Sequence, residues 1–294
     1  MKPYLAPAPR VPAAICRYGD SRLAFRGPRR RLTGDYLLFL GSTDTYGKFI
    51  EQPYPALLER VLGLPCINMA CVNAGIDAFR KDRTVWEAAH SARAVVLQVL
   101  GAHNLSNRFY TVHPRRNDRF LRASTVLQRL YPEIDFADYS FTRHLLGELR
   151  ATDPHRFTIV EEELRAAWTA RTKTLIEEIG RPVILFWFSD QEPLDGAVDP
   201  DDLPGAEPLF ITREMIETVR PATRTVVELS PSRRVMAGDT DGMVFDPSDE
   251  PMARQLLGVG AHRQAAAILT GPLRRVLAGH EGRTTEPRRA EAGP

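Results

Sequence analysis

Small hydroxyl-bearing and acidic side chains follow directly on an apolar run near residue 40. Residues 36–40 contain no turn former, and Gly41 then leads into Ser42, Thr43 and Asp44. A serine or threonine hydroxyl attacks an acyl group when a base removes its proton and hydrogen-bond donors hold the developing negative charge. Ser42 and Thr43 are therefore the candidate nucleophiles. The alternative is that they only cap the helix that follows.

Polar residues suited to assist this chemistry follow two later apolar runs. Asn73 and Gly75 come after residues 64–70, and His103 and Asn104 come after residues 94–100. Carboxyl ends of parallel strands meet at one edge of a sheet, so we expect these residues to lie near the hydroxyls. The Gly75 N–H and the Asn104 amide would form an oxyanion hole, and Asn73 and His103 would contact the substrate. Alternatively, the asparagines only bind backbone in turns.

A candidate general base lies late in the chain. His262 stands at the start of an expected helix over residues 261–277, where its ring could accept the hydroxyl proton. An acid would have to orient the ring, and Asp246 and Asp249 are the candidates. The alternative is a helix residue without a reaction to serve.

Two arginine-rich segments offer anion binding. Arg115 and Arg116 lie in residues 112–120 and carry planar, forked donors suited to phosphate or carboxylate, and Asn107 could add a hydrogen bond. The alternative is a solvated loop whose arginines pair with Asp118. A second segment, residues 21–32, is either a solvated arm packed through apolar side chains or an anion-binding arm.

Five apolar runs must position these residues. They span 36–40, 64–70, 94–100, 182–188 and 225–229, with helical patterns between most of them. Alternation of short strands and helices is typical of βαβ units. We predict an α/β, flavodoxin-like three-layer sandwich with a parallel five-stranded sheet. An extended arm (1–30) would precede one domain (31–280), with a helical cap over about 105–155, and a disordered tail (281–294) would follow.

Composition excludes several classes of protein. The net charge of +2 over 294 residues does not favour nucleic acid as a partner. The three cysteines lack metal-ligand spacing, so we expect buried thiols, no metal and no cofactor. No apolar stretch is long enough to span a membrane, and no signal peptide is visible, so we expect a cytoplasmic protein. The oligomeric state stays open.

The order of these short motifs resembles that of the SGNH (GDSL-type) hydrolase superfamily. The matching blocks start at Gly41, Asn73, Gly101 and Gly260. Laid on the family pattern, Ser42 takes the aspartate position and Thr43 the nucleophile position. A shift by one residue makes Ser42 the nucleophile but breaks the match of Thr45 and Gly47. His103 stands where the family has asparagine, and Val259 stands where it has the orienting aspartate. The chain also resembles an uncharacterised bacterial family with a similar Thr-Tyr-Gly-Lys-Phe start and Ser-Asn-Arg-Phe-Tyr run.

The SGNH resemblance implies a hydrolase or acyl transferase with an SGNH-type fold. The substrate expected from the arginines is an ester of an anionic or carbohydrate molecule. The departures from the pattern favour a second hypothesis, a catalytically inactive binding or assembly protein that uses the same pocket.

Overall fold

Five strands form one parallel sheet in the order β4-β3-β5-β8-β9. Their bounds are Leu37–Leu40 (β3), Cys66–Asn68 (β4), Ala94–Gln98 (β5), Val183–Phe188 (β8) and Thr225–Leu229 (β9). In order along the chain this is 2-1-3-4-5, the flavodoxin-like arrangement. The computed structural model, which describes residues 15–195, 207–231 and 239–281, confirms the predicted α/β fold with a five-stranded parallel sheet.

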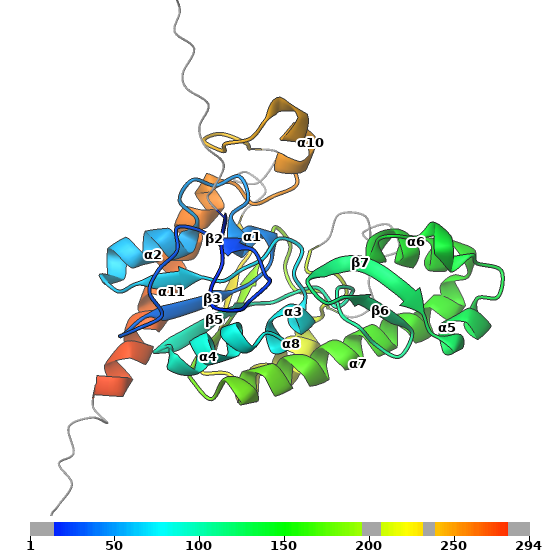
Figure 1. The fold of residues 1–294 in the computed structure, drawn as a ribbon, viewed down its shortest axis with the longest axis horizontal. Coiled ribbons are helices and arrows are strands. Elements are labelled where there is room, and N and C mark those ends of the chain that lie inside the picture. The colour runs from blue at the N-terminus through cyan, green and yellow to red at the C-terminus, as the bar shows by residue number, and fades with distance from the viewer. Residues whose placement is uncertain (1–14, 196–206, 232–238, 282–294) are drawn as a thin grey trace, which may run out of the picture.

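Helices cover both faces of the sheet (Figure 1). On one face α2 packs against α11, and on the other α7 contacts α3, α4 and α8. The helices are α1 (Thr43–Tyr46), α2 (Tyr54–Leu62), α3 (Ile76–Arg80), α4 (Arg83–Ser91), α5 (Thr125–Leu130), α6 (Thr142–Thr152), α7 (Pro154–Ile179), α8 (Arg213–Val219), α10 (Glu250–Ala253) and α11 (Val259–Glu281). Short 3-10 turns are η1 (Phe136–Asp138), η3 (Arg220–Ala222) and η4 (Pro247–Asp249).

Each central strand contributes to two hydrophobic cores. Leu38 and Leu40 of β3 face the core under α3, α4 and α7, whereas Leu37 and Phe39 face the core under α2 and α11. Side chains alternate between the faces of a strand, so a strand covered on both sides needs apolar residues at every position. This explains why the central strands were recognisable as continuous apolar runs.

The segment from residue 105 to 155 contains a feature that the sequence did not indicate. Tyr110–His113 (β6) and Arg116–Ala123 (β7) pair as an antiparallel hairpin, followed by α5 and α6 (green in Figure 1). The interpretation of residues 112–120 as a solvated loop is therefore wrong, because most of them lie in β6 and β7. Alternating burial of Tyr110, Val112 and Phe120 is the strand signal, and intervening polar residues concealed it.

A short N-terminal hairpin pairs β1 (Ile15–Cys16) with β2 (Phe25–Arg26). Arg26 is 6% exposed, so the interpretation of residues 21–32 as a solvated arm is wrong for this side chain. Its guanidinium donates to four backbone carbonyls, those of Tyr46, Gly47, Ile50 and Glu51. We call this arrangement the Arg26 clamp. Burial lowers the pKa of Arg26, and the carbonyl dipoles supply the partners that a carboxylate would otherwise provide.

Two predicted segments fall outside the described residues. Residues 282–294 of the expected tail are not described, and Glu281 ends α11. Residues 1–14 of the expected N-terminal arm are likewise not described.

Candidate functional site

The carboxyl ends of β3 and β5 form the topological switch point of the sheet. The chain leaves β3 toward α2 on one face, whereas after β5 it continues to α7 on the other face. Open α/β sheets place their ligand sites at such a point. The loop after β4 joins it, because Cys71 N donates to Gly41 O at 3.1 Å. The three loops predicted to converge therefore do meet.

Gln98 organises the loop after β3. Its side-chain oxygen accepts hydrogen bonds from Ser42 N at 2.9 Å and from Thr45 Oγ1 at 2.7 Å. A Cβ at Gly41 would lie 2.6 Å from the same oxygen, so only glycine fits there. Sequence reasoning missed Gln98, although a single polar residue within the apolar run 94–100 was an available signal.

The two candidate hydroxyls differ in their surroundings. Thr43 Oγ1 donates to Asn73 Oδ1 and accepts from Asn73 N, both at 3.1 Å. Asn73 in turn donates to Asp118 of β7 at 3.2 Å. Ser42 is half-buried, and its hydroxyl has no hydrogen-bond partner among the residues that the structure describes. Ser42 is therefore the freer of the two, while Thr43 is held by Asn73.

His262 is buried in the core between α11 and the sheet. Its Nδ1 accepts a hydrogen bond from Tyr54 N at 3.1 Å, and its ring contacts those of Tyr54 and Phe188. Burial lowers the pKa of His262 to about 3. Because a backbone N–H can only donate, Nδ1 must be the acceptor, and the ring proton of the neutral imidazole sits on Nε2.

This arrangement separates His262 from the candidate nucleophiles. Its Nε2 is buried and has no hydrogen-bond partner in the described part of the chain, so neither Ser42 nor Thr43 is bonded to it. A base must present a lone pair to the hydroxyl, and here Nε2 carries the proton. The role expected for His262 would require the hydrogen bond from Tyr54 to break.

The two expected oxyanion donors lie side by side but differ in availability. A Cβ on Gly75 would be 1.7 Å from Asn104 O, so the two loops approach as closely as backbones can. The Gly75 N–H already donates to Asn117 Oδ1 at 2.8 Å. Asn104 Oδ1 accepts from Thr142 Oγ1 at 2.9 Å, and its NH₂ group has no partner among the described residues. Of the two, the Asn104 amide is the free donor.

His103 belongs to a charged group at the end of β5. Its Nε2 lies 3.5 Å from a carboxylate oxygen of Glu207, which also forms an ion pair with Arg143. Burial lowers the pKa of His103 to about 4, against the opposing effect of Glu207. Burial would raise the pKa of Glu207, but His103 and Arg143 together hold it below its usual value. Sequence reasoning found neither Glu207 nor Arg143.

Asp44 is a further titratable group at this edge, which sequence reasoning also missed as a site residue. Burial raises its pKa to about 7, opposed by a hydrogen bond from Leu257 N, and the nearby carboxylates of Glu207 and Asp190 raise it further. A carboxyl group with a pKa near neutrality can act as a general base or acid. Such perturbed groups gather at functional sites.

The remaining predicted residues lie on or near the β6–β7 hairpin. Asn107 binds backbone, since its Oδ1 accepts from Phe109 N and Tyr110 N. Arg115 and Arg116 are exposed at the hairpin turn, and their backbone N–H groups donate to His113 Nδ1. The alternative pairing of these arginines with Asp118 is absent from the described residues. Asn117 and Asp118 instead fasten the hairpin to the loop of Asn73 and Gly75.

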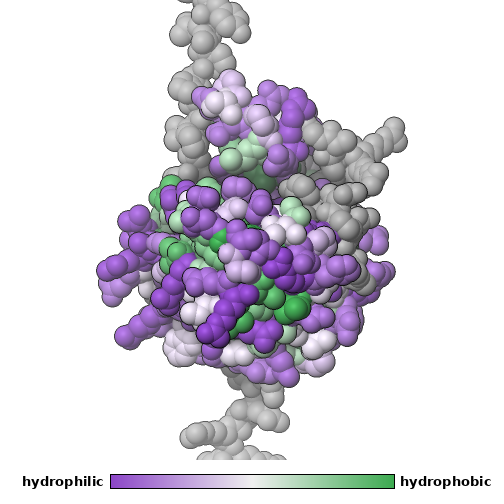
Figure 2. Space-filling view, turned by 90° about the vertical axis from the view of Figure 1, so that its right-hand side faces the viewer, coloured by the Kyte–Doolittle hydropathy of each residue, from purple (hydrophilic) through white to green (hydrophobic). Residues whose placement is uncertain are grey.

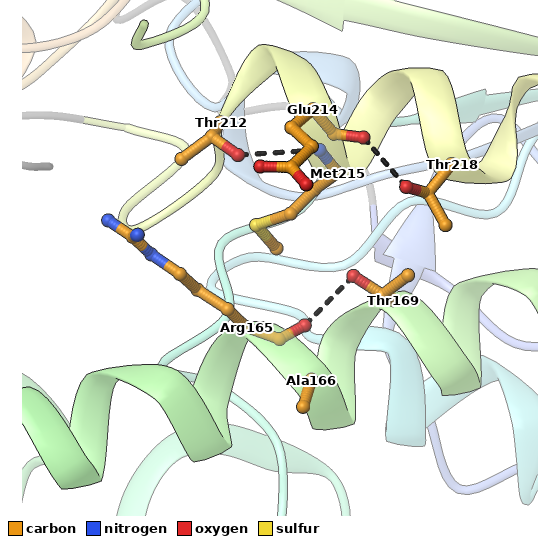
Figure 3. Close-up of a pocket in the computed structure, with 7 residues that line it drawn as sticks. All are labelled: Arg165, Ala166, Thr169, Thr212, Glu214, Met215 and Thr218. Carbon is orange, nitrogen blue, oxygen red and sulfur yellow. Dashed lines mark hydrogen bonds between the residues drawn. The ribbon is translucent and has the colours of Figure 1, made fainter. Parts of the chain in front are cut away.

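A cavity of about 460 Å³ lies elsewhere, between α7 and α8 (Figure 3). Its lining includes Arg165, Thr169 and Met215, and no residue predicted from the sequence as a site residue. Within the described ranges, no group of three or more His, Cys, Asp or Glu side chains could hold a metal ion. No helix in these ranges is long and apolar enough to cross a membrane.

Comparison with known proteins assigns the chain to a family. Residues 1–277 match the family described as "Domain of unknown function (DUF6473)". The chain belongs to this family. No curated protein matches it. A solved structure that is similar is the lipase Lip_vut3 from a goat rumen metagenome, at 13% sequence identity and a TM-score of 0.36, over 83% of this chain and 97% of that chain. The finer resemblance to SGNH hydrolases stays a prediction.

Proposed function

We propose that this protein is an ester hydrolase or acyl transferase of SGNH type with Ser42 as its nucleophile. The observation that carries the proposal is the half-buried Ser42 at the switch point, whose hydroxyl has no hydrogen-bond partner among the described residues. The hydroxyl of the neighbouring Thr43 is already hydrogen-bonded to Asn73. A hydroxyl without a structural role, at the place where α/β sheets bind ligands, is available for chemistry.

Asp44 is the base in this proposal. It lies two residues after Ser42, and a carboxylate whose pKa is about 7 is basic enough to accept a hydroxyl proton near neutral pH. Asp44 Oδ1 accepts from Leu257 N at 3.4 Å, and no hydrogen bond joins Asp44 to Ser42 among the described residues, so the proposal requires the two side chains to turn toward each other when substrate binds. The Ser42 oxygen adds to the ester carbonyl, and the alcohol departs with the proton. Water or a second alcohol then gives its proton to Asp44 and attacks the acyl-serine; the bond between the acyl carbon and the Ser42 oxygen breaks, Ser42 regains the proton, and the acyl group leaves as an acid or a new ester. The Asn104 amide holds the oxyanion in both steps.

The substrate class follows from the arginines beside the loop of Asn73. Arg115 and Arg116 stand at the turn of the hairpin that Asn117 and Asp118 fasten to this loop. Their guanidinium groups suit a carboxylate or phosphate on the ester, such as that of a sugar acid. The proposed substrate is therefore an acylated anionic or carbohydrate molecule, as expected from the sequence.

Hydrolysis of a panel of short acyl esters and acylated sugar acids tests the proposal. We expect Ser42→Ala and Asp44→Asn each to lower kcat/KM by about a hundredfold or more, because each removes a reacting group. Thr43→Val should retain most of the activity. The wild-type rate should rise with pH to a plateau above about 7, and Asp44→Asn should lose this rise. Equal losses in Ser42→Ala and Thr43→Val would contradict the choice of nucleophile.

A second function, ligand binding without catalysis, is favoured by His262. Its Nδ1 is occupied by Tyr54 N and its ring is enclosed by aromatic side chains, so it serves the core. If no ester in the panel reacts above the buffer rate, the same sugar acids should still raise the melting temperature. Arg115→Gln with Arg116→Gln should then abolish that increase. No reaction and no thermal shift would contradict both functions.

A further inference from the structure

The β6–β7 hairpin and α5 carry a cluster of arginines without carboxylate partners. Residues 106–130 contain six arginines, and their acidic residue, Asp118, is bound to Asn73. Arg108 pairs with Glu163. Within the part of the chain that the structure describes, the other five arginines form no ion pair: Arg115, Arg116, Arg119, Arg122 and Arg129. Residues 106–130 are therefore basic, although the chain as a whole is nearly neutral.

An apolar groove lies next to these arginines. It has a volume of about 420 Å³ and is lined by Arg108, Phe109, Val126, Arg129, Leu130 and Ile159. Val126 is 53% exposed and Ile159 is 42% exposed, which is high for branched aliphatic side chains. Figure 2 faces this end of the molecule and shows an apolar patch within a hydrophilic surface. Exposed apolar patches rimmed by polar residues mark interaction sites.

We propose that this groove binds anionic phospholipid at a membrane surface. Arg129, which has no ion-pair partner among the described residues, lies at the groove to receive a phosphate, whereas Arg108 is paired with Glu163. Val126, Leu130 and Ile159 offer an apolar wall to acyl chains. Val126, Arg129 and Leu130 share one face of α5, since residues three and four apart are neighbours on a helix. A basic rim around exposed aliphatic residues is the pattern of elements that lie on anionic membranes.

Charge and side-chain type argue against the other occupants. A second copy placed face to face would bring two sets of unpaired arginines together, and like charges at a desolvated contact repel. Single-stranded nucleic acid is held mainly by stacking on aromatic rings. The exposed groove residues are aliphatic. Phe141 lies near the hairpin and is 42% exposed, but the guanidinium of Arg119 occupies one face of its ring at 3.9 Å from the centroid. The proposal is independent of the reaction at Ser42.

Co-sedimentation of the full chain with vesicles tests this site. The probes are vesicles of phosphatidylcholine alone and of phosphatidylcholine with phosphatidylglycerol. We expect binding only to the second kind, weakened by added salt. Arg122→Gln with Arg129→Gln should weaken this binding by about tenfold or more, and Val126→Ser should weaken it severalfold.

Matched control variants remove the same kinds of side chain from surfaces away from the groove. Arg263→Gln with Arg274→Gln takes two arginine charges from α11, and Val61→Ser removes a valine of α2 that is 50% exposed. Both should leave vesicle binding unchanged. Equal effects of Val126→Ser and Val61→Ser, binding to both kinds of vesicle alike, or no binding would overturn the proposal. So would a dimer in analytical ultracentrifugation that dissociates on Val126→Ser.

Discussion

Asp44 is the carboxyl group whose titration should leave the clearest trace on stability. Its pKa of about 7 lies above its usual value of 3.8. The folded chain then keeps a proton that the unfolded chain loses, so the free energy of unfolding falls as pH rises from about 4 to about 7. We expect Asp44→Asn to remove this fall and to exceed wild type by the order of 1 kcal/mol above neutral pH.

Urea titrations of Asp44→Asn at mildly acidic and mildly alkaline pH check this expectation. The exposed Asp241→Asn is the control, and it should track wild type at both pH values. The same stability difference at both pH values for Asp44→Asn would show that the effect is one of packing and not of titration.

His262 should affect the free energy of unfolding at acidic pH. Its folded pKa of about 3 lies below its usual value of 6.5, so the unfolded chain binds a proton that the folded chain refuses. Stability from this group is complete above about pH 6.5 and is lost progressively toward pH 3. We expect His262→Gln, which keeps an acceptor for Tyr54 N, to show a shallower acid-side loss of stability. His155→Gln, at an exposed position, should keep the wild-type slope, and a matching slope in both variants would rule the argument out.

At the scale of elements, the contact between the loops after β4 and β5 depends on Gly75. A Cβ there would lie 1.7 Å from Asn104 O, which is backbone and cannot turn aside. We expect Gly75→Ala to destabilise the fold by about 3 kcal/mol or more. The matched change Gly147→Ala, at an exposed position of α6 with no atom near the added methyl, should stabilise by about 1 kcal/mol. Thermal unfolding of both variants measures this, and a Gly75→Ala variant as stable as wild type would contradict the close approach.

The elements also show how far a single sequence leads. The five strands were predicted because each central strand is covered on both faces, and residues 94–98 and 183–188 are therefore apolar almost throughout. The helix end at Gly63 follows from a glycine with positive φ, which the sequence signals by residue type. The β6–β7 hairpin was missed because Asn117 is buried in it for its hydrogen bonds to Gly75 N and Ala78 N. The sequence alone does not distinguish an asparagine that is buried for its hydrogen bonds from one that is exposed in a loop.

The sequence predicted the position of the candidate site residues better than it predicted their hydrogen-bond partners. That Ser42, Asn73 and Asn104 gather at one edge follows from strand order, which the alternation of strands and helices indicates. The partners of His262 and Thr43 do not follow from it. Tyr54 lies 208 residues before His262, and pattern reasoning has no means to pair a ring nitrogen with a distant backbone N–H.

At the scale of the whole molecule, Asp77 ties three parts together. It is 1% exposed, binds Arg171 of α7 at 2.6 and 2.7 Å, and accepts Ser106 N from the loop that opens the cap segment. The Asp77 carboxylate is buried, whereas the Arg171 side chain is 28% exposed and can turn to water when its partner is removed. We expect Asp77→Ala to cost about 1–3 kcal/mol in the free energy of unfolding, because it removes the buried acceptor of Arg171 and of Ser106 N.

A second ion pair between the same helices is the control. The side chains of Arg80 of α3 and Glu178 of α7 are 36% and 40% exposed, so Glu178→Gln should cost less than about 1 kcal/mol. Guanidinium titrations of the two variants compare a buried and a surface link between the same elements. A similar cost for both would contradict the idea that burial makes the Asp77 link the stronger one.

The Arg26 clamp has a consequence for how a growing polypeptide reaches its final form. Arg26 is synthesised before any strand of the parallel sheet, yet its guanidinium holds the carbonyls that follow α1, the helix that starts beside Ser42. We therefore expect the loop after α1 to reach its final conformation only when the β1–β2 hairpin has packed against it. A chain that began after residue 30 would keep every strand of the parallel sheet, but it would leave the carbonyls of Tyr46, Gly47, Ile50 and Glu51 without the donor that Arg26 supplies.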